Sequence, residues 1–260
     1  MAERLIRRRP IQCVTGASIR KWALIFLAAG TVGRSIFQNA LVGLDSLTTD
    51  QLAAAMNASD AVSTYVTIAL VCKVLETCAA PLFCFLLVEG FRHTSHFEKY
   101  LLRVGALALV CELPYNLAYN GKLLFLGSRN PVFGMFLALV MLYFFSRYDA
   151  KGMKNTAMKV LIFVAAFLWA NMLRIDQGVC VVILVALLWM ARDKSHFRAL
   201  YAFGGAMACS LFNMYYMGGC LACIFLHRYN DEQGEQDRRL SYAAYPVMLL
   251  VIGIAAKFIG

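Results

Sequence analysis

The sequence predicts an all-α membrane protein, a polytopic bundle of eight or nine transmembrane helices that forms one domain over residues 1–260. Hydrophobic residues make up 61% of the chain and charged residues 15%, whereas an average soluble domain carries about 25% charged residues. A soluble chain of this size could not hide so much apolar surface in one core. The composition therefore excludes a soluble enzyme, a disordered segment and a nucleic-acid-binding domain.

Apolar segments long enough to cross a bilayer recur along the chain, since a spanning helix needs about 20 mostly apolar residues. The segment 197–227 is long for one helix and short for two, and we expect either a turn or a kink at Gly218–Gly219. Residues 45–61 are expected to form a solvated external loop with one amphipathic turn at most. The other expected spans lie near residues 22–44, 62–90, 99–119, 130–146, 157–173, 177–192 and 241–259.

The distribution of Lys and Arg predicts that the N-terminus lies in the cytoplasm, because cytoplasmic connections carry an excess of positive charge. Residues 1–20 form a basic segment, whereas residues 45–61 contain three Asp and no Lys or Arg. Basic connections then return at 92–99, 147–159 and 192–198, each separated from the next by two expected spans. The net charge of +10 is thereby explained without a nucleic-acid partner.

The nine cysteines predict no metal centre and no disulfide framework. Most of them lie inside apolar segments, where Cys behaves as a small apolar residue. Cys220 and Cys223 form a CxxC pair, but a structural zinc site needs further ligands, so we interpret the pair as helix packing. The chain also lacks a Gly-rich phosphate loop and the HExxH and GxSxG motifs.

Charged residues inside the expected spans each cost at least about 2.5–3.5 kcal/mol on insertion scales, so they should find partners. Lys73 and Glu76 are three residues apart on one helix face and can pair, which favours a structural role. Arg34 and Glu112 have no such neighbour, so we expect their partners on other helices. The candidates for charges at the depth of the bilayer are Arg34, Lys73, Glu76, Arg103 and Glu112.

Prolines also lie inside expected spans, among them Pro81 in 62–90 and Pro114 in 99–119. Pro81 and Pro114 each remove a backbone hydrogen bond and are expected to kink their helices. Kinked spans with freed carbonyls often line cavities, although a proline can also do no more than shape the helix.

Polar chemistry is densest between residues 89 and 103. Glu89 and His93 are four residues apart on one helical face, and a carboxylate beside an imidazole can hold its tautomer and raise its basicity. Such a pair could deprotonate an amine or hydroxyl that attacks a thioester. Arg92, Lys99 and Arg103 form a basic rim that could hold the phosphates of a donor such as coenzyme A. A helix end among lipid headgroups would explain the same residues.

The same region resembles the TraX family. Residues 81–94 read PLFCFLLVEGFRHT, residues 99–103 read KYLLR and residues 112–114 read ELP, close to the family's PxFxFLxxEGFxHT, KYLxR and SExPF patterns. Weaker similarities occur at Asn130, Asp176–Gly178, Tyr229–Asn230 and Tyr245–Pro246. The resemblance covers roughly residues 70–250 and is specific over 81–116.

The resemblance implies a protein of the bacterial cytoplasmic (inner) membrane associated with N-terminal acetylation of conjugative pilin. It further implies an acyltransferase with acetyl-coenzyme A as co-substrate, no tightly bound cofactor, and a pilin-like protein or a small molecule as acceptor beside the lipid bilayer. In this interpretation Glu89 orients His93 and His93 is the general base. Arg103 offsets charge on the thioester oxygen or anchors donor phosphates, Glu112 shapes the acceptor site, and Arg92 and Lys99 bind the donor.

Departures from the family pattern mark this chain as a divergent member. The family's first span carries an Asp–His pair, whereas residues 27–33 here read LAAGTVG. The histidine of its YPxH motif is replaced by Met248. These losses support a second reading, a catalytically inactive relative that acts in membrane interaction or assembly. A small transporter is a third reading, based on the charges and prolines within the spans.

Overall fold

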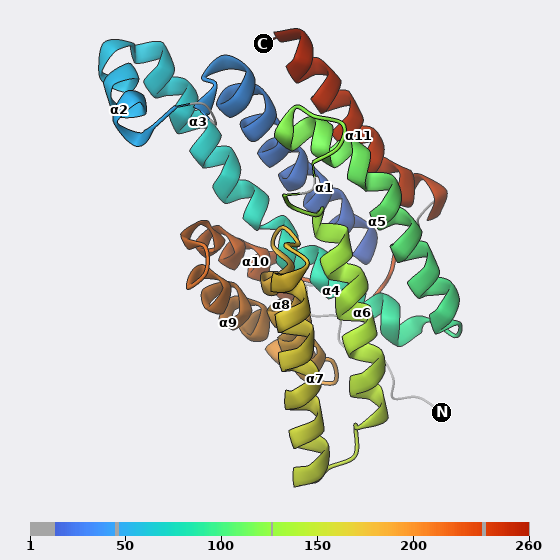
Figure 1. Ribbon diagram of the computed structural model, residues 1–260. Helices are drawn as coiled ribbons and strands as arrows, with labels where there is room; N and C mark the ends of the chain where they lie inside the picture. The colour runs from blue at the N-terminus through green and yellow to red at the C-terminus, as the bar shows by residue number, and fades with distance from the viewer. Residues whose placement is uncertain (1–13, 45–46, 126, 236–237, 260) are drawn as a thin grey trace.

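The computed structural model describes residues 14–44, 47–125, 127–235 and 238–259, which fold into a bundle of helices (Figure 1). Two isolated β-bridges pair Val14 with Tyr229 and Arg129 with Ile175 in the connections. The predicted all-α class is therefore confirmed. The helices are α1 Gly16–Val32 with a π-helical continuation Gly33–Leu41, α2 Thr49–Ala58, α3 Asp60–Thr77, α4 Ala79–His93, α5 Phe97–Asn120, α6 Pro131–Arg147, α7 Met153–Met172, α8 Gly178–Met190, α9 Arg198–Ser210, α10 Ala222–His227 and α11 Arg238–Ile259, with short 3₁₀ helices Ser195–Phe197 and Met214–Leu221.

Five helical segments in the described part of the chain are long and apolar enough to cross a membrane. They are Gly16–Leu41, Asp60–His93, Phe97–Asn120, Met153–Met172 and Tyr242–Ile259. Pro131–Arg147, Gly178–Met190 and Met214–His227 are apolar but shorter. This pattern supports a multi-pass membrane protein, while the number of spans stays a prediction.

The basic connections meet at one end of the bundle. Arg92 Nη1, before α5, donates a hydrogen bond of 2.7 Å to the carbonyl of Arg192, after α8. Arg192 in turn forms an ion pair with Asp149, between α6 and α7. At the opposite end the connections before α6 and before α8 meet, with the Asp176 amide donating to the Arg129 carbonyl at 2.8 Å. From α5 to α8, successive connections therefore lie at alternate ends of the bundle, as the Lys and Arg pattern predicted.

The N-terminal end of α1 and the connection between α10 and α11 lie together as well. The Gly16 and Ala17 amides donate to the carbonyls of Glu232 and Gln233, each at 2.9 Å. These carbonyls satisfy helix-terminal amides that have no partner within the helix. Arg198, at the start of α9, pairs with Asp231 in the same connection, so the segment from α9 to α10 leaves and returns at one end.

The expectation of a loop over residues 45–61 was wrong where the structure describes it, because α2 occupies most of this segment. The Thr48 side chain accepts from the Gln51 amide, and the Gln51 side chain accepts from the Thr48 amide at 2.9 Å. This reciprocal capping box satisfies two helix-terminal amides and starts a helix. Asp45 lies outside the described residues, as does most of the basic segment 1–20.

The segment 197–227 turns at residues 211–213, so the expectation of a turn or kink at Gly218–Gly219 was wrong. Asn213 caps the 3₁₀ helix Met214–Leu221 by accepting a hydrogen bond of 3.1 Å from the Tyr215 amide. Gly218 instead permits close packing, since a Cβ there would lie 2.4 Å from the Val74 carbonyl of α3. The glycine is needed for helix contact and not for chain reversal.

The expected span 62–90 consists of α3 and α4, joined at Cys78. Pro81 is the third residue of α4, within the first turn, where backbone amides have no helical partner to lose. The break in the helix therefore precedes Pro81. Pro114 lies inside α5 as expected.

The expected pairing of Lys73 with Glu76 is confirmed, and a residue of another helix joins it. Lys73 Nζ lies 3.0 Å from Glu76 Oε2, and the Tyr119 hydroxyl of α5 donates to Glu76 Oε1 at 3.0 Å. Arg34, in the continuation of α1, lies over the ring of Tyr119 with its guanidinium carbon 5.1 Å from the ring centre. Thr31 shares a 3.3 Å hydrogen bond with the same hydroxyl. One network thus joins α1, α3 and α5.

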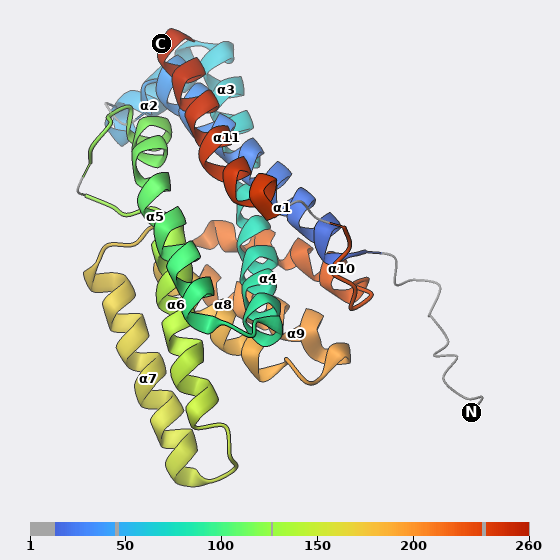
Figure 2. The same cartoon turned by 90° about the vertical axis from the view of Figure 1, so that its right-hand side faces the viewer.

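Small residues let α1 approach this network. A Cβ at Gly30 would lie 2.2 Å from Glu76 Cβ, and a Cβ at Gly33 would lie 2.4 Å from Cys72 Cβ. Membrane helices gain little from apolar burial against each other, so close approach through small residues is a main source of their association. Figure 2 shows the outcome, with α1 between α3 and α11 and with α5 beside α11.

We expect Gly30→Ala to destabilise the bundle by about 1–3 kcal/mol, because the added methyl group overlaps the Glu76 side chain. The melting temperature of the detergent-purified protein measures the effect. Gly204→Ala in α9 is the control, since nothing lies within 4 Å of the added Cβ. The control should melt at or above the wild-type temperature, because Ala favours a helix by about 1 kcal/mol over Gly. Equal melting of both variants would contradict the packing argument.

Candidate functional site

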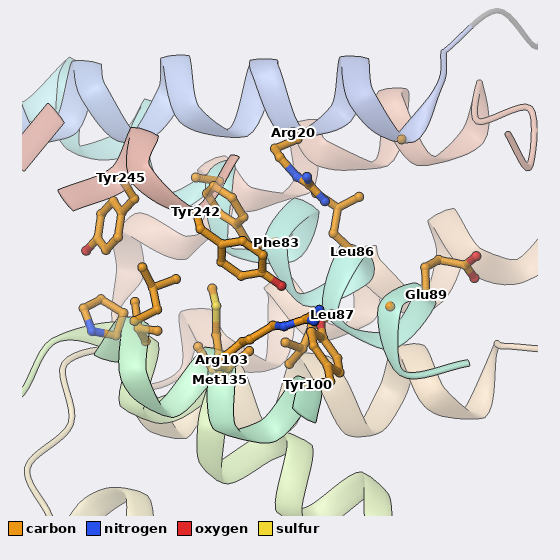
Figure 3. Close-up of a pocket in the computed structure, with 18 of the residues that line it drawn as sticks. Arg20, Phe83, Leu86, Leu87, Glu89, Tyr100, Arg103, Met135, Tyr242 and Tyr245 are labelled. Carbon is orange, nitrogen blue, oxygen red and sulfur yellow. The ribbon is translucent and has the colours of Figure 1, made fainter. Parts of the chain in front are cut away.

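A cavity of about 510 Å³ lies between α1, α4, α5, α6 and α11, at the end of the bundle where the basic connections meet (Figure 3). Its rim includes His93 and His96, from the short turn between α4 and α5, and Tyr229 from the α10–α11 connection. Its inner end reaches Glu76 and Gln177. The cavity therefore runs from the polar end of the bundle to a carboxylate inside it.

Four of the six site residues predicted from the sequence line this cavity: Glu89, His93, Lys99 and Arg103. They come from the end of α4 and the first two turns of α5. The turn at residues 94–96 reverses the chain, so that the last turn of α4 and the first turns of α5 face the same hollow. Arg92 and Glu112 are not among the residues that line it.

His93 is held by the backbone of its own helix. Its Nδ1 lies 2.8 Å from the carbonyl oxygen of Glu89 and 3.7 Å from the Glu89 carboxylate. A carbonyl can only accept, so Nδ1 carries a proton and Nε2 of the neutral ring keeps its lone pair. The predicted pairing of Glu89 with His93 is present, but the shorter contact runs through the backbone. The side chain of His93 is 56% exposed, so Nε2 can be reached.

The carboxylate of Glu89 is also held by Arg92, whose Nη1 lies 3.2 Å from Oε1. Arg92 faces away from the cavity toward the connection after α8, where it contacts the Arg192 carbonyl and Asp193. It therefore links the end of α4 to α8 and fixes Glu89. Binding of a donor by Arg92 stays a prediction.

Glu112 belongs to a cluster at the start of α6. Its Oε2 accepts hydrogen bonds from Asn130 Nδ2 at 2.6 Å and from the Asn130 amide at 3.3 Å, and its Oε1 lies 3.5 Å from Arg129 Nη1. Asn130 also caps α6 through the Val132 amide at 3.0 Å. The expectation that Glu112 finds its partner outside its own helix is confirmed. Its place in an acceptor site stays a prediction.

Polar cavity residues that were not predicted from the sequence include Arg20 of α1, Tyr100 of α5 and Tyr242 of α11. Arg20 and Tyr242 point into the cavity from its upper side and Arg103 from its lower side (Figure 3). Tyr100 packs against α4, where a Cβ at Gly90 would lie 2.7 Å from its hydroxyl. Arg20 was taken as part of a basic N-terminal segment. Arg20 lies seven residues before Leu27, on the face that α1 presents to α4. This spacing could have indicated that Arg20 faces the inside of the bundle.

The rim of the cavity is positively charged. Arg20, Lys99 and Arg103 line it, whereas the one rim carboxylate, Glu89, is already paired with Arg92. Burial raises the pKa of the Tyr229 hydroxyl to about 12, with Glu89 and Asp231 adding to the effect. Tyr229 is therefore a neutral hydrogen-bond donor at physiological pH. The cations and the neutral Tyr229 hydroxyl at the rim suit the anionic part of a ligand, whose other end would reach inward.

The arrangement offers a base, cations and a hollow, which together suit group transfer. Within the described residues no group of three or more His, Cys, Asp or Glu side chains could hold a metal ion. The chemistry that these residues can perform is proton transfer at His93 and charge stabilisation at Arg103 and Lys99.

A family model described as TraX protein matches residues 38–256, which includes every cavity residue of α4 and α5 and most of α11. None of the curated proteins matches the chain, and none of the solved structures does.

We expect Asn130→Ala to lower stability by about 2 kcal/mol, because it removes the cap of α6 and the side-chain donor that lies 2.6 Å from the Glu112 carboxylate. The readout is the melting temperature in detergent. Asn155→Ala removes an exposed amide that contacts only the Ala150 carbonyl at 3.0 Å, and should leave it unchanged. An Asn130 variant as stable as the wild type would show that this cluster does not hold α5 to α6.

Proposed function

We propose that this chain, which belongs to the TraX family, is a membrane-embedded acyltransferase that moves an acetyl group from acetyl-coenzyme A to an amine or hydroxyl acceptor at the membrane. The observation that carries the proposal is the convergence of Glu89, His93, Lys99 and Arg103 on one cavity. We place this cavity at the cytoplasmic end, since the connections that meet there hold the excess of Lys and Arg.

The donor would bind at the rim. Lys99 and Arg20 line the part of the cavity nearest the polar end of the bundle, and cations there favour the phosphates of coenzyme A. The acetyl thioester would then reach inward past Gly90 and Tyr100. Arg92 supports this site by holding Glu89 and the end of α4, which makes it a positioning residue in this scheme.

His93 would act as general base. Nδ1 is committed to the Glu89 carbonyl, so Nε2 is the nitrogen that can take a proton from the acceptor. The acceptor nitrogen or oxygen forms a bond to the acetyl carbon, and the carbon–sulfur bond breaks. The proton held by His93 passes to the departing thiolate, which leaves as the coenzyme A thiol.

Arg103 would stabilise the negative charge that develops on the thioester oxygen, or hold a phosphate beside it. Its side chain points into the cavity from α5 (Figure 3). A guanidinium placed where charge develops lowers the barrier because it needs no rearrangement during the reaction. Glu112 is not one of the residues that line the cavity. It would shape the acceptor site indirectly, through Asn130 and the start of α6.

The second candidate function is that of an inactive relative that acts in membrane interaction or assembly. A specific observation favours it. The segment of α1 where the family carries its Asp–His pair begins at Leu27 and holds neither residue, and Leu27 and Leu24 line the cavity with apolar side chains. Met248 stands at the position of the YPxH histidine. If those lost groups carried proton transfer, His93 with Glu89 would be the imidazole–carboxylate pair that replaces them, and without that replacement the activity would be lost.

We expect His93→Ala to lower acetyl transfer by about 10²–10⁴-fold, the range typical of a general base. Radiolabelled acetyl-coenzyme A is added to inverted membrane vesicles that contain the protein, and label in the membrane fraction is counted, so the acceptor need not be known. His196→Ala is the matched control, because His196 is exposed near the same end of the bundle and does not line the cavity.

Three outcomes separate the two functions. Transfer that is lost in the His93 variant and kept in the His196 variant supports the acyltransferase. Transfer that is equal in both removes His93 from the mechanism. Wild-type vesicles that incorporate no label above empty vesicles, together with no shift in melting temperature on titration with coenzyme A, support the inactive relative.

A further inference from the structure

A second hollow lies on the outside of the bundle, between α5 and α11. It measures about 840 Å³ and its lining is apolar except for Arg103 and Tyr242 at one end. Pro114 of α5 and Pro246 of α11 both line it, and each lies inside its helix. Each proline removes one backbone hydrogen bond from its helix and disturbs the preceding turn beside the groove.

The groove faces the surroundings of the bundle. Val110, Val247 and Leu250, which line it, are 60%, 55% and 44% exposed. The exposed Leu113 continues this apolar surface on α5. In a protein of this composition such a surface faces lipid chains.

Arg103 stands where the groove meets the cavity. Arg103, Leu107 and Tyr242 line both hollows, so the two spaces border each other at this end of the groove. Arg103 is exposed, and no hydrogen bond or ion pair joins it to another side chain that the structure describes. A guanidinium within a membrane helix is costly unless it meets an anion or the interface. The neighbouring charges Arg20 and Lys99 favour an anion here.

The dimensions of the groove match one leaflet of a bilayer. From Arg103 to Pro114 the chain of α5 rises by about 16 Å, at 1.5 Å per residue. Half of a hydrocarbon core of about 30 Å is about 15 Å. The groove side of α5 runs from Arg103 through Leu107 and Val110 to Pro114, so a cation is followed by apolar residues at helical spacing. This order of residues matches a lipid, whose charged headgroup is followed by an apolar acyl chain.

We propose that the groove between α5 and α11 is a binding site for an anionic phospholipid. One acyl chain lies along Leu107, Val110, Pro246 and Leu250, and the phosphate contacts Arg103, so the headgroup enters the mouth of the cavity. This site does not depend on the acyltransferase proposal, because an inactive relative with the same fold would bind the lipid equally well.

The test compares lipid retention by native mass spectrometry of the full chain in mild detergent, with equimolar phosphatidylglycerol and phosphatidylcholine that carry the same acyl chains. Arg103→Gln removes the cation, and Ala243→Trp fills the groove from α11 without changing charge. Arg147→Gln, at the end of α6, and Ile254→Trp, on α11 outside the groove, are the matched controls. All four positions are exposed, so the melting temperatures should stay near the wild-type value.

The wild type and both controls should retain one phosphatidylglycerol in preference to phosphatidylcholine. Arg103→Gln should lose that preference by about tenfold or more, the size of a lost charged hydrogen bond. Ala243→Trp should retain neither lipid. The proposal is overturned if Ala243→Trp binds phosphatidylglycerol like the wild type, if the wild type retains no lipid, or if a polypeptide and not a lipid is lost from the Trp variant.

Discussion

A carboxylate inside an apolar bundle has to be paired, and the pairing of Glu76 determines how α1, α3 and α5 come together. Glu76 is 3% exposed, and it receives Lys73 from its own helix and the Tyr119 hydroxyl from α5. Breaking one side of such a buried pair leaves an uncompensated charge, which is strongly destabilising. The glycines of α1 allow that helix to pack over the Glu76 side chain, and Thr31 completes the network from the same helix. The three helices are therefore held in one arrangement.

The cavity follows from that arrangement. With α1 fixed against α3, and α5 fixed through Tyr119, the short helix α4 lies between them and its last turn faces the first turns of α5. The hollow that remains is bounded by Glu76 at its inner end and by His93 and Lys99 at its rim. The chain belongs to the TraX family, and the base and cations around this hollow are the basis of the proposed transfer.

Much of this structure was predictable from the sequence, because its strongest signals are local. Long apolar segments and the placement of Lys and Arg predicted the helices and the grouping of their connections. Spacing within one helix predicted the contact of Lys73 with Glu76 and of Glu89 with His93. Pairing across helices depends on how the helices pack, so the partners of Glu112 and the position of Arg20 needed the structure.

The remaining differences have local causes that compete with hydropathy. The capping box at Thr48 produced a helix where the acidic, polar sequence suggested a loop. The glycines at 218 and 219 looked like a turn, but they relieve packing against α3, and Asn213 provides the turn signal instead. Tyr100 and Tyr242 could not be separated by sequence alone from the many aromatic residues of the spans, since a cavity residue and a packing residue have the same pattern.

The proposed function requires a water-accessible hollow that opens at the proposed cytoplasmic end of a membrane-embedded bundle. Single cysteines in a variant without the native cysteines test this directly, with a charged thiol reagent applied to each face of membrane vesicles. Leu86→Cys, in the cavity wall, should react from the cytoplasmic face, and Leu168→Cys, 58% exposed on α7, should not react because it faces lipid. An unreactive Leu86→Cys, or one labelled only from the opposite face, would contradict the account.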